Sequence, residues 1–471
     1  MKKLIIYIKT LCIVIYFSTY YATGQDITGK WYATLLIESN ELRLIFDIVQ
    51  TDSLLSATLS SPDQGVSNIP LEKVRFNNSV LSISHPPIGM EYSGVYTNER
   101  ILGTFRQSGL SAPLQLTKRA PEGSGRPQEP GKPYPYKENE ILFINYKDSI
   151  VLAGTLSCPA EGEKFDAVIL ISGSGPQNRN QEIAGHKPFL VLSDHLTKSG
   201  LAVLRYDDRG VGASGGVFAN ATTIDFAEDL FWAVRYLESR DDINRIGLIG
   251  HSEGAIVASI VASQHPGKIE FIVLMAGPAL PGKEILLTQQ EAISLAGGSS
   301  KEEVLEYIRI NRGLFSIIEE SIESLPMEKV RDSLELFLNN ETGASVGSAI
   351  IRQQVNTLTS PWMLFFLNYD PRNTLSKVQS HILAINGTKD LQVLAAQNLN
   401  QLYNTIIGGD REGEIDIIRN NKHVTIIEFE GINHLFQLCN TGHPSEYSKI
   451  EETINPSVLD TISAWINRIL Q

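Results

Sequence analysis

The sequence contains only three cysteines among its 471 residues, and none of them has the Cys/His spacing of a metal site. So few cysteines exclude a small scaffold held together by disulfides. The absence of paired Cys and His motifs excludes a zinc site of the usual kind. Cys12 precedes the first predicted domain, which leaves Cys158 and Cys439 either as one disulfide or as two free thiols.

Positive charge is also scarce. The chain contains 40 Lys and Arg residues and 53 Asp and Glu residues, so its formal net charge is −13. This balance disfavours a nucleic-acid partner. Beyond the first residues, no stretch reaches the roughly 20 apolar residues of a membrane span. The composition, 42% hydrophobic and 20% charged, is that of a globular protein of two or three domains. Nothing in the sequence indicates an oligomeric state.

The first 24 residues have the pattern of a signal peptide. Three lysines precede an apolar run over Leu11–Phe17, and the small residues Ala22 and Gly24 follow it. We therefore expect residues 1–24 to be removed and the protein to be exported to the periplasm or the cell exterior. An uncleaved membrane anchor is the alternative. Removing three lysines would bring the net charge to about −16, and no cysteine stands where a lipid anchor would need one.

Residues 25–119 form the first predicted domain. Leu42, Leu44, Phe46 and Ile48 alternate with other residues, and Tyr92–Gln107 reads as a hairpin. Short alternating strands at this spacing predict a small all-β barrel or sandwich. Five prolines then make residues 120–137 a stiff, extended linker without a core of its own.

From residue 138 onward, buried strands alternate with helical stretches, which predicts βαβ units and a mostly parallel sheet. We place the strands at 150–156, 167–171, 202–206, 246–249, 271–275, 382–385 and 424–429. One segment interrupts the alternation, because residues 281 to about 360 are largely helical and polar. We expect this segment to form a helical cap inserted after the strand at 271–275.

The segment "IGLIGHSEGAIVAS" places Ser252 within the pattern G-x-S-x-G. The five residues alone are a weak signal, but a buried strand precedes them and an Ala/Val/Ile-rich helix follows. That strand–turn–helix setting is the one in which such a serine is a nucleophile. Gly250 and Gly254 permit a sharp turn with close packing. The following helix would point its N-terminal amides at the serine. A structural turn with an incidental serine is the alternative.

A nucleophilic serine needs a base and an acid that orients the base. His434, just past the strand at 424–429, and Asp390, just past the strand at 382–385, complete the order Ser–Asp–His. Both would lie at strand carboxyl ends, where such sheets bind ligands. His251 and His186 are the competing bases, and Asp370 is the alternative acid.

An oxyanion hole requires two preorganised N–H donors. The backbone amide of Glu253, directly after the nucleophile, is the first candidate. The second is expected in the glycine-rich loop "ISGSGPQNRN", where we favour the amide of Ser174 over that of Gly175. A glycine-rich turn without this role is the alternative.

From about residue 139 to its end, the chain resembles the α/β-hydrolase superfamily. It is most similar to secreted bacterial serine esterases of the serine-aminopeptidase-like branch. The stretches that carry the resemblance are "ILISGSGPQNRN", "GHKPFLVLSDHLTKSGLAVLRYDDRGVGASGG", "IGLIGHSEGAIVAS", "LAINGTKDLQV" and "GINHLFQ". The resemblance implies a mostly parallel eight-stranded sheet, neither metal nor organic cofactor, and the triad Ser252, Asp390 and His434.

Two details qualify the resemblance. Asp208, Arg209 and Gly210 match the family's D-R-G turn, which we interpret as structural. Many relatives have His-Gly where this chain has Ser172-Gly173, so the second oxyanion donor does not follow from the family.

The sequence thus predicts a serine hydrolase that cleaves short-chain acyl esters of small molecules or glycans. An aminopeptidase of the same fold is one alternative, and it would need cap carboxylates to hold a free amino group. A solvated helix face explains those carboxylates more simply; the candidates are Glu302, Glu303, Glu319, Glu320 and Glu323. The other alternative is a glycan- or envelope-binding protein that uses Trp31, Tyr32 and Tyr92 of the β domain.

Overall fold

The computed structural model describes residues 27–37, 40–51, 54–61, 66–97, 99–107, 109–119, 126–343, 346–407, 418–420 and 424–471. The predicted signal peptide, residues 1–24, lies outside these ranges, as does the start of the predicted linker. The chain divides near residue 121 into two compact units, which are described separately below.

The N-terminal unit is one antiparallel sheet of nine strands among the described residues, in the order β4-β3-β2-β1-β9-β8-β7-β6-β5. Its two ends approach each other, because β3 and β4 lie near β5 and β6, so the sheet is nearly closed. The strands are β1 (Gly29–Ile37), β2 (Asn40–Thr51), β3 (Leu54–Ser61), β4 (Val66–Leu71), β5 (Lys73–Asn77), β6 (Val80–His85), β7 (Met90–Thr97), β8 (Arg100–Gln107) and β9 (Leu110–Thr117).

Alternating side chains fill the interior of this nearly closed sheet. Trp31, Phe46 and Tyr92 are fully buried there. The Trp31 indole donates to the carbonyl of Ile27, and the Tyr92 hydroxyl donates to that of Leu114. Two of the three aromatics that a glycan-binding surface would have used are therefore part of the core. The packing of a small barrel, which needs large apolar side chains inside, accounts for them.

The second unit is built on a nine-stranded sheet in the order β10-β11-β13-β12-β14-β15-β16-β18-β17. Six neighbouring strands in this order, from β13 through β12, β14, β15 and β16 to β18, run parallel. The strands β10, β11 and β17 pair antiparallel with their neighbours. Their bounds are β10 (Lys137–Asn145), β11 (Ile150–Cys158), β12 (Phe165–Ile171), β13 (Ala202–Tyr206), β14 (Ile243–His251), β15 (Phe271–Met275), β16 (His381–Gly387), β17 (Ile418–Asn420) and β18 (Val424–Phe429).

The expected count of eight strands is wrong by one for the part of the chain that is described. The sequence pattern missed β10 and β17, which lie at the two edges of the sheet. An edge strand buries less of its surface, so its sequence is less apolar. Leu142 on β10 remains 65% exposed, and β17 has only three residues, "IRN".

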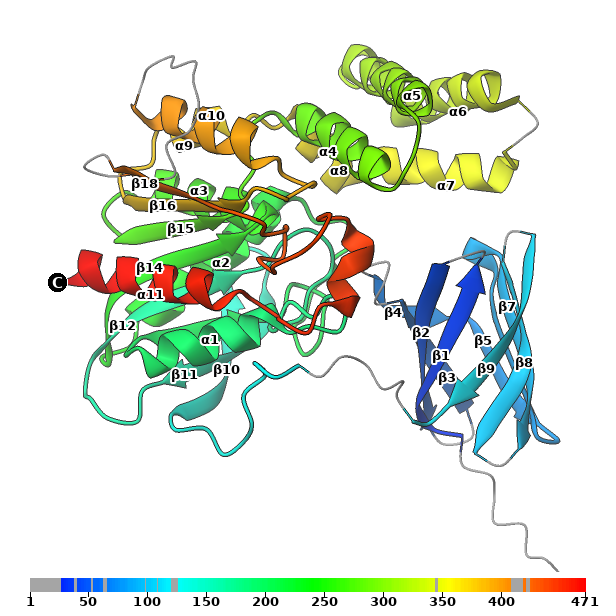
Figure 1. Cartoon of the computed structure of the whole chain (residues 1–471), viewed down its shortest axis with the longest axis horizontal. Helices are drawn as coiled ribbons and strands as arrows, with labels where there is room; N and C mark the ends of the chain where they lie inside the picture. The colour runs from blue at the N-terminus through cyan, green and yellow to red at the C-terminus, as the bar shows by residue number, and fades with distance from the viewer. Residues whose placement is uncertain are drawn as a thin grey trace, which may run out of the picture. The chain divides into compact units, whose positions relative to one another are not determined.

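Helices cover both faces of this sheet (Figure 1). On β12, Val168 and Leu170 face α1 (Pro188–Lys198) and α11 (Pro456–Leu470). Ile169 faces the opposite layer, which consists of α2 (Thr223–Glu238), α3 (Glu253–Gln264), α9 (Arg372–Leu375) and α10 (Ala395–Ile407). The central strands are buried on both faces, which explains their continuous apolar runs.

A helical cap is inserted between β15 and β16. Its helices are α4 (Gly282–Ala296), α5 (Lys301–Ser321), α6 (Met327–Thr342), α7 (Ser348–Leu358) and α8 (Pro361–Asn368). The cap has its own core, which includes Leu314, Leu334 and Val355. Helix α8 also lies near α2, so it forms the side of the cap that meets the sheet domain. The helices therefore continue eight residues past the expected end near 360, into the apolar segment "PWMLFFLN".

The described part of the predicted linker, residues 126–136, is bound to the second unit. The Arg126 guanidinium donates to the carbonyls of Gly185, Ser448 and Ile450 at 2.5–3.1 Å. Gln128 exchanges hydrogen bonds with the backbone of Ile454. A proline-rich segment can thus lie extended and still be fixed, because its side chains supply the donors that loop carbonyls need.

Two further predictions concern cysteines and membrane spans. Cys158 and Cys439 are both free thiols. No helix in the described ranges is both long and apolar enough to cross a bilayer.

Candidate active site

Ser252 occupies the turn between β14 and α3. Its backbone has φ 54° and ψ −119°, a conformation that costs a non-glycine residue energy and persists only where the surroundings enforce it. Two backbone hydrogen bonds enforce it here. Ser252 N–H donates to the carbonyl of Met275 at 2.9 Å, and its own carbonyl accepts from Ala255 N–H at 3.0 Å. The strain holds the serine side chain clear of both elements, at the carboxyl edge of the sheet.

The two glycines of the motif are required by close packing. A Cβ on Gly250 would lie 2.1 Å from the carbonyl oxygen of Gly254. A Cβ on Gly254 would lie 2.2 Å from the carbonyl oxygen of Ile171 on the neighbouring strand β12. Both contacts are with backbone atoms, which cannot rotate away as a side chain could. The turn therefore brings α3 directly against β12.

His434 and Asp390 form a buried pair. Nδ1 of His434 lies 2.8 Å from Oδ2 of Asp390, and the two side chains are 5% and 0% exposed. The other carboxylate oxygen of Asp390 accepts the N–H groups of Gln392 and Val393 at 2.8 and 2.9 Å. Asp390 follows β16 and His434 follows β18, the two strands beyond β15 in the sheet. Both residues thus lie at the same edge as Ser252.

The competing residues have other partners. His251 is buried, with Nε2 at 2.9 Å from the carbonyl oxygen of His434 and Nδ1 at 2.7 Å from the Gln181 amide nitrogen. Because a carbonyl only accepts, Nε2 carries the hydrogen and Nδ1 accepts. Burial above all, together with the neighbouring His434, lowers the pKa of His251 to about 3, so the ring is neutral.

The remaining two competitors also lie away from the serine. His186 is buried against Thr453 and the carbonyl of Tyr447. Asp370 pairs with Arg372 in front of β16. Of the histidines and acids considered, only His434 and Asp390 combine with Ser252 at one edge of the sheet.

The loop after β12 runs alongside the serine. A Cβ on Gly173 would lie 3.2 Å from Cβ of Ser252, so this glycine lets the loop backbone approach the nucleophile closely. Ser174 is exposed at the surface of the loop, and its side chain interacts with the Glu253 carboxyl and lowers the pKa of that group. Glu253 itself is the first residue of α3, and its side chain is buried.

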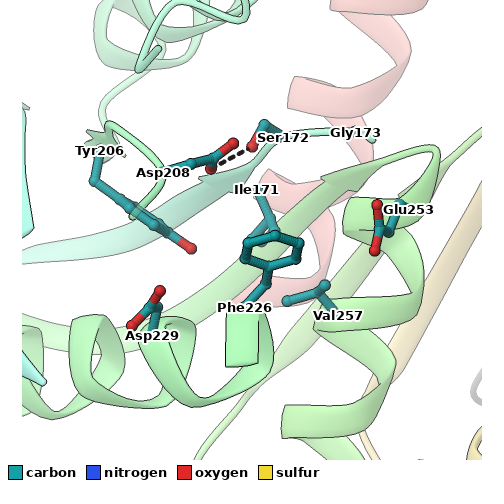
Figure 2. A pocket seen from close by; sticks show the side chains of 9 residues that line it. All are labelled: Ile171, Ser172, Gly173, Tyr206, Asp208, Phe226, Asp229, Glu253 and Val257. Carbon is teal, nitrogen blue, oxygen red and sulfur yellow. Dashed lines mark hydrogen bonds between the residues drawn. The ribbon is translucent and has the colours of Figure 1, made fainter. Parts of the chain in front are cut away.

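Asp208 supports this loop from behind. Its carboxylate accepts the Ser172 hydroxyl at 2.8 Å and the Gln177 N–H at 2.9 Å. Burial raises its pKa to about 8, although these two hydrogen bonds oppose the shift. Figure 2 shows Asp208 bonded to Ser172 on one side of a pocket, with Glu253 on another side. The volume of this pocket is about 10 Å³, which is room for one water. The aspartate of the D-R-G turn thus holds this loop beside Ser252, which is a structural role.

A cavity of about 210 Å³ opens over the serine. Ser252, His434, Gly173, Ser174 and Glu253 line its base. Apolar side chains form most of its walls, from the cap and from the strand-end loops: Ile183, Pro278, Ile285, Leu286, Trp362, Phe366, Val393 and Leu435. Four glutamines supply neutral polar groups: Gln177, Gln181, Gln289 and Gln392. The described residues contain no group of three or more His, Cys, Asp or Glu side chains that could hold a metal ion.

Comparison with known proteins shows a similarity to hydrolases. Residues 187–316 match the Hydrolase_4 family, described as serine aminopeptidase, S33. Esterase EstD of Thermotoga maritima is 25% identical over 319 residues, which are 67% of this chain and 65% of the length of that esterase. The chain is thus similar to hydrolases of the α/β-hydrolase superfamily.

Solved structures with this likeness include two esterases. An esterase from Pyrococcus furiosus is 16% identical, with 74% of this chain and 97% of that chain covered and a TM-score of 0.42. Est1E from Butyrivibrio proteoclasticus, with ferulic acid bound, is 13% identical, with 70% and 99% covered and a TM-score of 0.39.

Sequence reasoning missed several residues of the hydrolase site. Trp362 and Phe366 come from α8, which lies beyond the expected end of the cap, and their rings stack at 5.2 Å between centroids. The sequence pattern assigned a role to the backbone amide of Glu253 and none to its side chain. The one available signal was the segment "PWMLFFLN" at the end of a polar cap, which contains one of the four tryptophans. Apolar side chains on every face of a short helix indicate a helix buried on several sides.

Proposed function

We propose that this α/β hydrolase is a serine esterase that cleaves short-chain acyl esters through an acyl-enzyme. Ser252 is the nucleophile, His434 the base and Asp390 the orienting acid. The observation that carries the proposal is the buried His434–Asp390 pair at the same sheet edge as the strained Ser252. EstD, the curated relative, is itself named an esterase.

The proposed reaction has two halves. His434 accepts the Ser252 proton as the serine oxygen attacks the ester carbonyl, and the backbone amides of Ser174 and Glu253 stabilise the oxyanion. Collapse of the tetrahedral intermediate breaks the bond to the alcohol, which takes its proton from His434. Water then attacks the acyl-enzyme with the same groups in the same roles. Asp390 stabilises the imidazolium in both halves and stays ionised.

The cavity supports a small, uncharged substrate. Its 210 Å³ is below the roughly 300–1,000 Å³ of sites for drug-sized ligands. Its walls are mostly apolar, its glutamines are neutral carboxamides, and none of the described residues that line it is a Lys or Arg that could bind a substrate carboxylate. Short acyl chains fit these walls, and a hydroxylated alcohol, as in an acylated sugar, could bond to the glutamines.

The aminopeptidase alternative is weaker on the same grounds. It needs a free carboxylate beside the serine to bind the substrate's amino group. The five candidate glutamates of the cap are all exposed, and none of them lines the cavity: Glu302, Glu303, Glu319, Glu320 and Glu323. The carboxyl that does reach the cavity, Glu253, already accepts hydrogen bonds from Thr223 and Trp362.

A paired assay tests the proposal. The purified chain is offered p-nitrophenyl esters of increasing acyl length and a panel of aminoacyl p-nitroanilides, with Ser252→Ala alongside. We expect fast turnover of the short esters, and loss of the nucleophile lowers kcat on the order of a million-fold in the subtilisin precedent. Preference for the anilides would favour an aminopeptidase. Ester turnover that survives Ser252→Ala would overturn the assignment.

We also propose that the protein is exported, on the strength of the first 24 residues alone. N-terminal sequencing of protein recovered from the periplasm or culture medium tests this. A mature N-terminus near residue 25 is expected. An intact leader on cytoplasmic protein would contradict it.

A further inference from the structure

The side chain of Glu253 joins three separate elements next to the nucleophile. Its Oε1 accepts the Thr223 hydroxyl at 2.6 Å and the Trp362 indole N–H at 2.8 Å. The Ser174 side chain also interacts with this carboxyl and lowers its pKa. Thr223 begins α2, Trp362 belongs to cap helix α8, and Ser174 belongs to the loop after β12. One carboxyl therefore connects the sheet domain, the cap and the proposed oxyanion loop.

Burying the Glu253 carboxyl costs the folded protein free energy. It is 3% exposed, and the ion pairs among the described residues include none with Glu253. Burial raises its pKa, and the interactions with Thr223, Trp362 and Ser174 only partly oppose that shift. An apolar side chain would fill such a site more cheaply, because a buried acid without a cation loses its hydration for few compensating contacts. A role in holding its three partners in place accounts for a carboxyl here.

We propose that the Glu253 carboxyl is a positioning group that fixes cap helix α8 and the oxyanion loop in one arrangement around Ser252, and so determines which acyl groups the cavity accepts. The inference rests on the proposed ester hydrolysis and names what sets its specificity. It differs from the role of the Glu253 backbone amide, which any residue at this position would supply.

The link to specificity runs through Trp362. Its indole lines the cavity and stacks on Phe366 with an interplanar angle of 10°. The N–H bond to Glu253 fixes the orientation of that indole, and the stacked pair then forms one wall of the cavity. Without the bond, the indole can turn and the wall can move, so longer acyl groups gain room. Loss of the Ser174 interaction would at the same time loosen the loop that presents the proposed oxyanion donor.

Two substitutions separate these effects. Trp362→Phe removes the N–H donor and keeps an aromatic wall. We expect it to shift the ratio of kcat/KM for hexanoyl and acetyl p-nitrophenyl esters about fivefold or more toward the longer chain. Glu253→Met keeps the length of the side chain but removes the oxygen that accepts from Thr223 and Trp362. We expect the same shift, with kcat for the acetyl ester lowered about tenfold or more because one oxyanion donor is misplaced.

The chain offers a matched control. Trp232 donates its indole N–H to Glu228 at 3.0 Å within α2, and Trp232 does not line the cavity. Trp232→Phe makes the same chemical change outside the site, so we expect the acyl-length profile of the parent protein. In the Glu253→Met/Trp362→Phe double variant, the shift in the profile should equal that of Glu253→Met alone, because both changes break the same bond.

The outcomes are distinguishable. If the parent protein hydrolyses no ester, or Ser252→Ala remains active, the proposed function fails. If the parent is active and Trp362→Phe has the same profile as Trp232→Phe, the positioning role is wrong. A lower Tm with an unchanged profile in Glu253→Met would equally overturn it, because that is the result of a merely structural carboxyl. Should Glu253→Met fail to fold, the comparison of the two tryptophan variants still decides.

Discussion

The imidazole of His434 lies 2.8 Å from the carboxylate of Asp390, and neither side chain has appreciable contact with solvent. Both oxygens of Asp390 are engaged, one by His434 and the other by the backbone N–H groups of Gln392 and Val393. The carboxylate can therefore neither rotate nor take up water. Because Nδ1 donates to it, Nε2 is left unprotonated, which is the form that a base requires.

Asp390→Asn should lower kcat about 10⁴-fold with little change in fold. The carboxamide preserves the shape of the side chain but favours the wrong tautomer of His434, as in the corresponding substitution of serine proteases. Steady-state ester hydrolysis, with circular dichroism as a folding control, measures this. Near-normal kcat would show that Asp390 does not orient the base.

Gly254→Ala should destabilise the protein by about 3 kcal/mol or more, since a Cβ there would lie 2.2 Å from a backbone carbonyl oxygen. Gly131→Ala is the matched control, because no atom lies within 4 Å of the added Cβ, and its effect should stay within about 0.5 kcal/mol. Urea unfolding of the two variants provides the comparison. Equal midpoints would contradict the packing described for the turn.

Asp208 should make the protein less stable as pH rises from about 5 to 8. Burial raises its pKa from 3.8 to about 8, so between these values the folded state holds a proton that the unfolded chain has lost. Stability then falls with pH by at most about 1.4 kcal/mol per unit. Asp208→Asn stays neutral and should lack this decline. The prediction fails if the Tm difference between variant and parent is constant from pH 5 to 9.

His251 should act in the opposite direction on the acid side. Its pKa is lowered from 6.5 to about 3, so below pH 6.5 the unfolded chain binds a proton that the folded state excludes. The stability conferred by the neutral ring is present above pH 6.5 and is lost as the pH falls toward 3. His251→Gln, which cannot titrate, should show a shallower fall in Tm between pH 6.5 and 4. A slope identical to that of the parent protein would refute this.

Residues 122–471 should fold as an independent unit, because the contacts of the chain divide near residue 121. A shorter form, 137–471, removes Arg126 and Gln128 and with them the hydrogen bonds to the loops at 184–185 and 448–454. We expect a Tm several degrees lower for the shorter form and no such loss for the longer one. Equal Tm values would show that the anchored segment contributes nothing.

Much of the site could be predicted from local signals. The G-x-S-x-G turn can be recognised in the sequence because nearby backbone atoms leave no room for a side chain at its two glycines. Asp390 and His434 can be identified from the sequence because each directly follows an apolar strand. The carboxyl ends of parallel strands lie at the same edge of the sheet. Local pattern and global fold agree at these positions.

Other features follow from packing between distant segments. Trp362 and Glu253 are 109 residues apart, and no periodicity in either segment indicates that they meet. The edge strands β10 and β17 lack the apolar pattern because they are half covered. The proline content of the linker predicts only that its backbone is stiff and extended. It does not indicate which loops the linker's side chains contact.

The sequence by itself determined the division into a β domain and an α/β domain, the turn at Ser252 and the order of Ser252, Asp390 and His434. These depend on residues close together in the chain or on the direction in which strands run. Only the folded structure reveals which carboxyl bonds the loop after β12, where the cap ends and what lines the cavity. Those features depend on side chains that come into contact only when the sheet and the cap pack together. Contacts between residues that are far apart in the sequence produce no local sequence pattern.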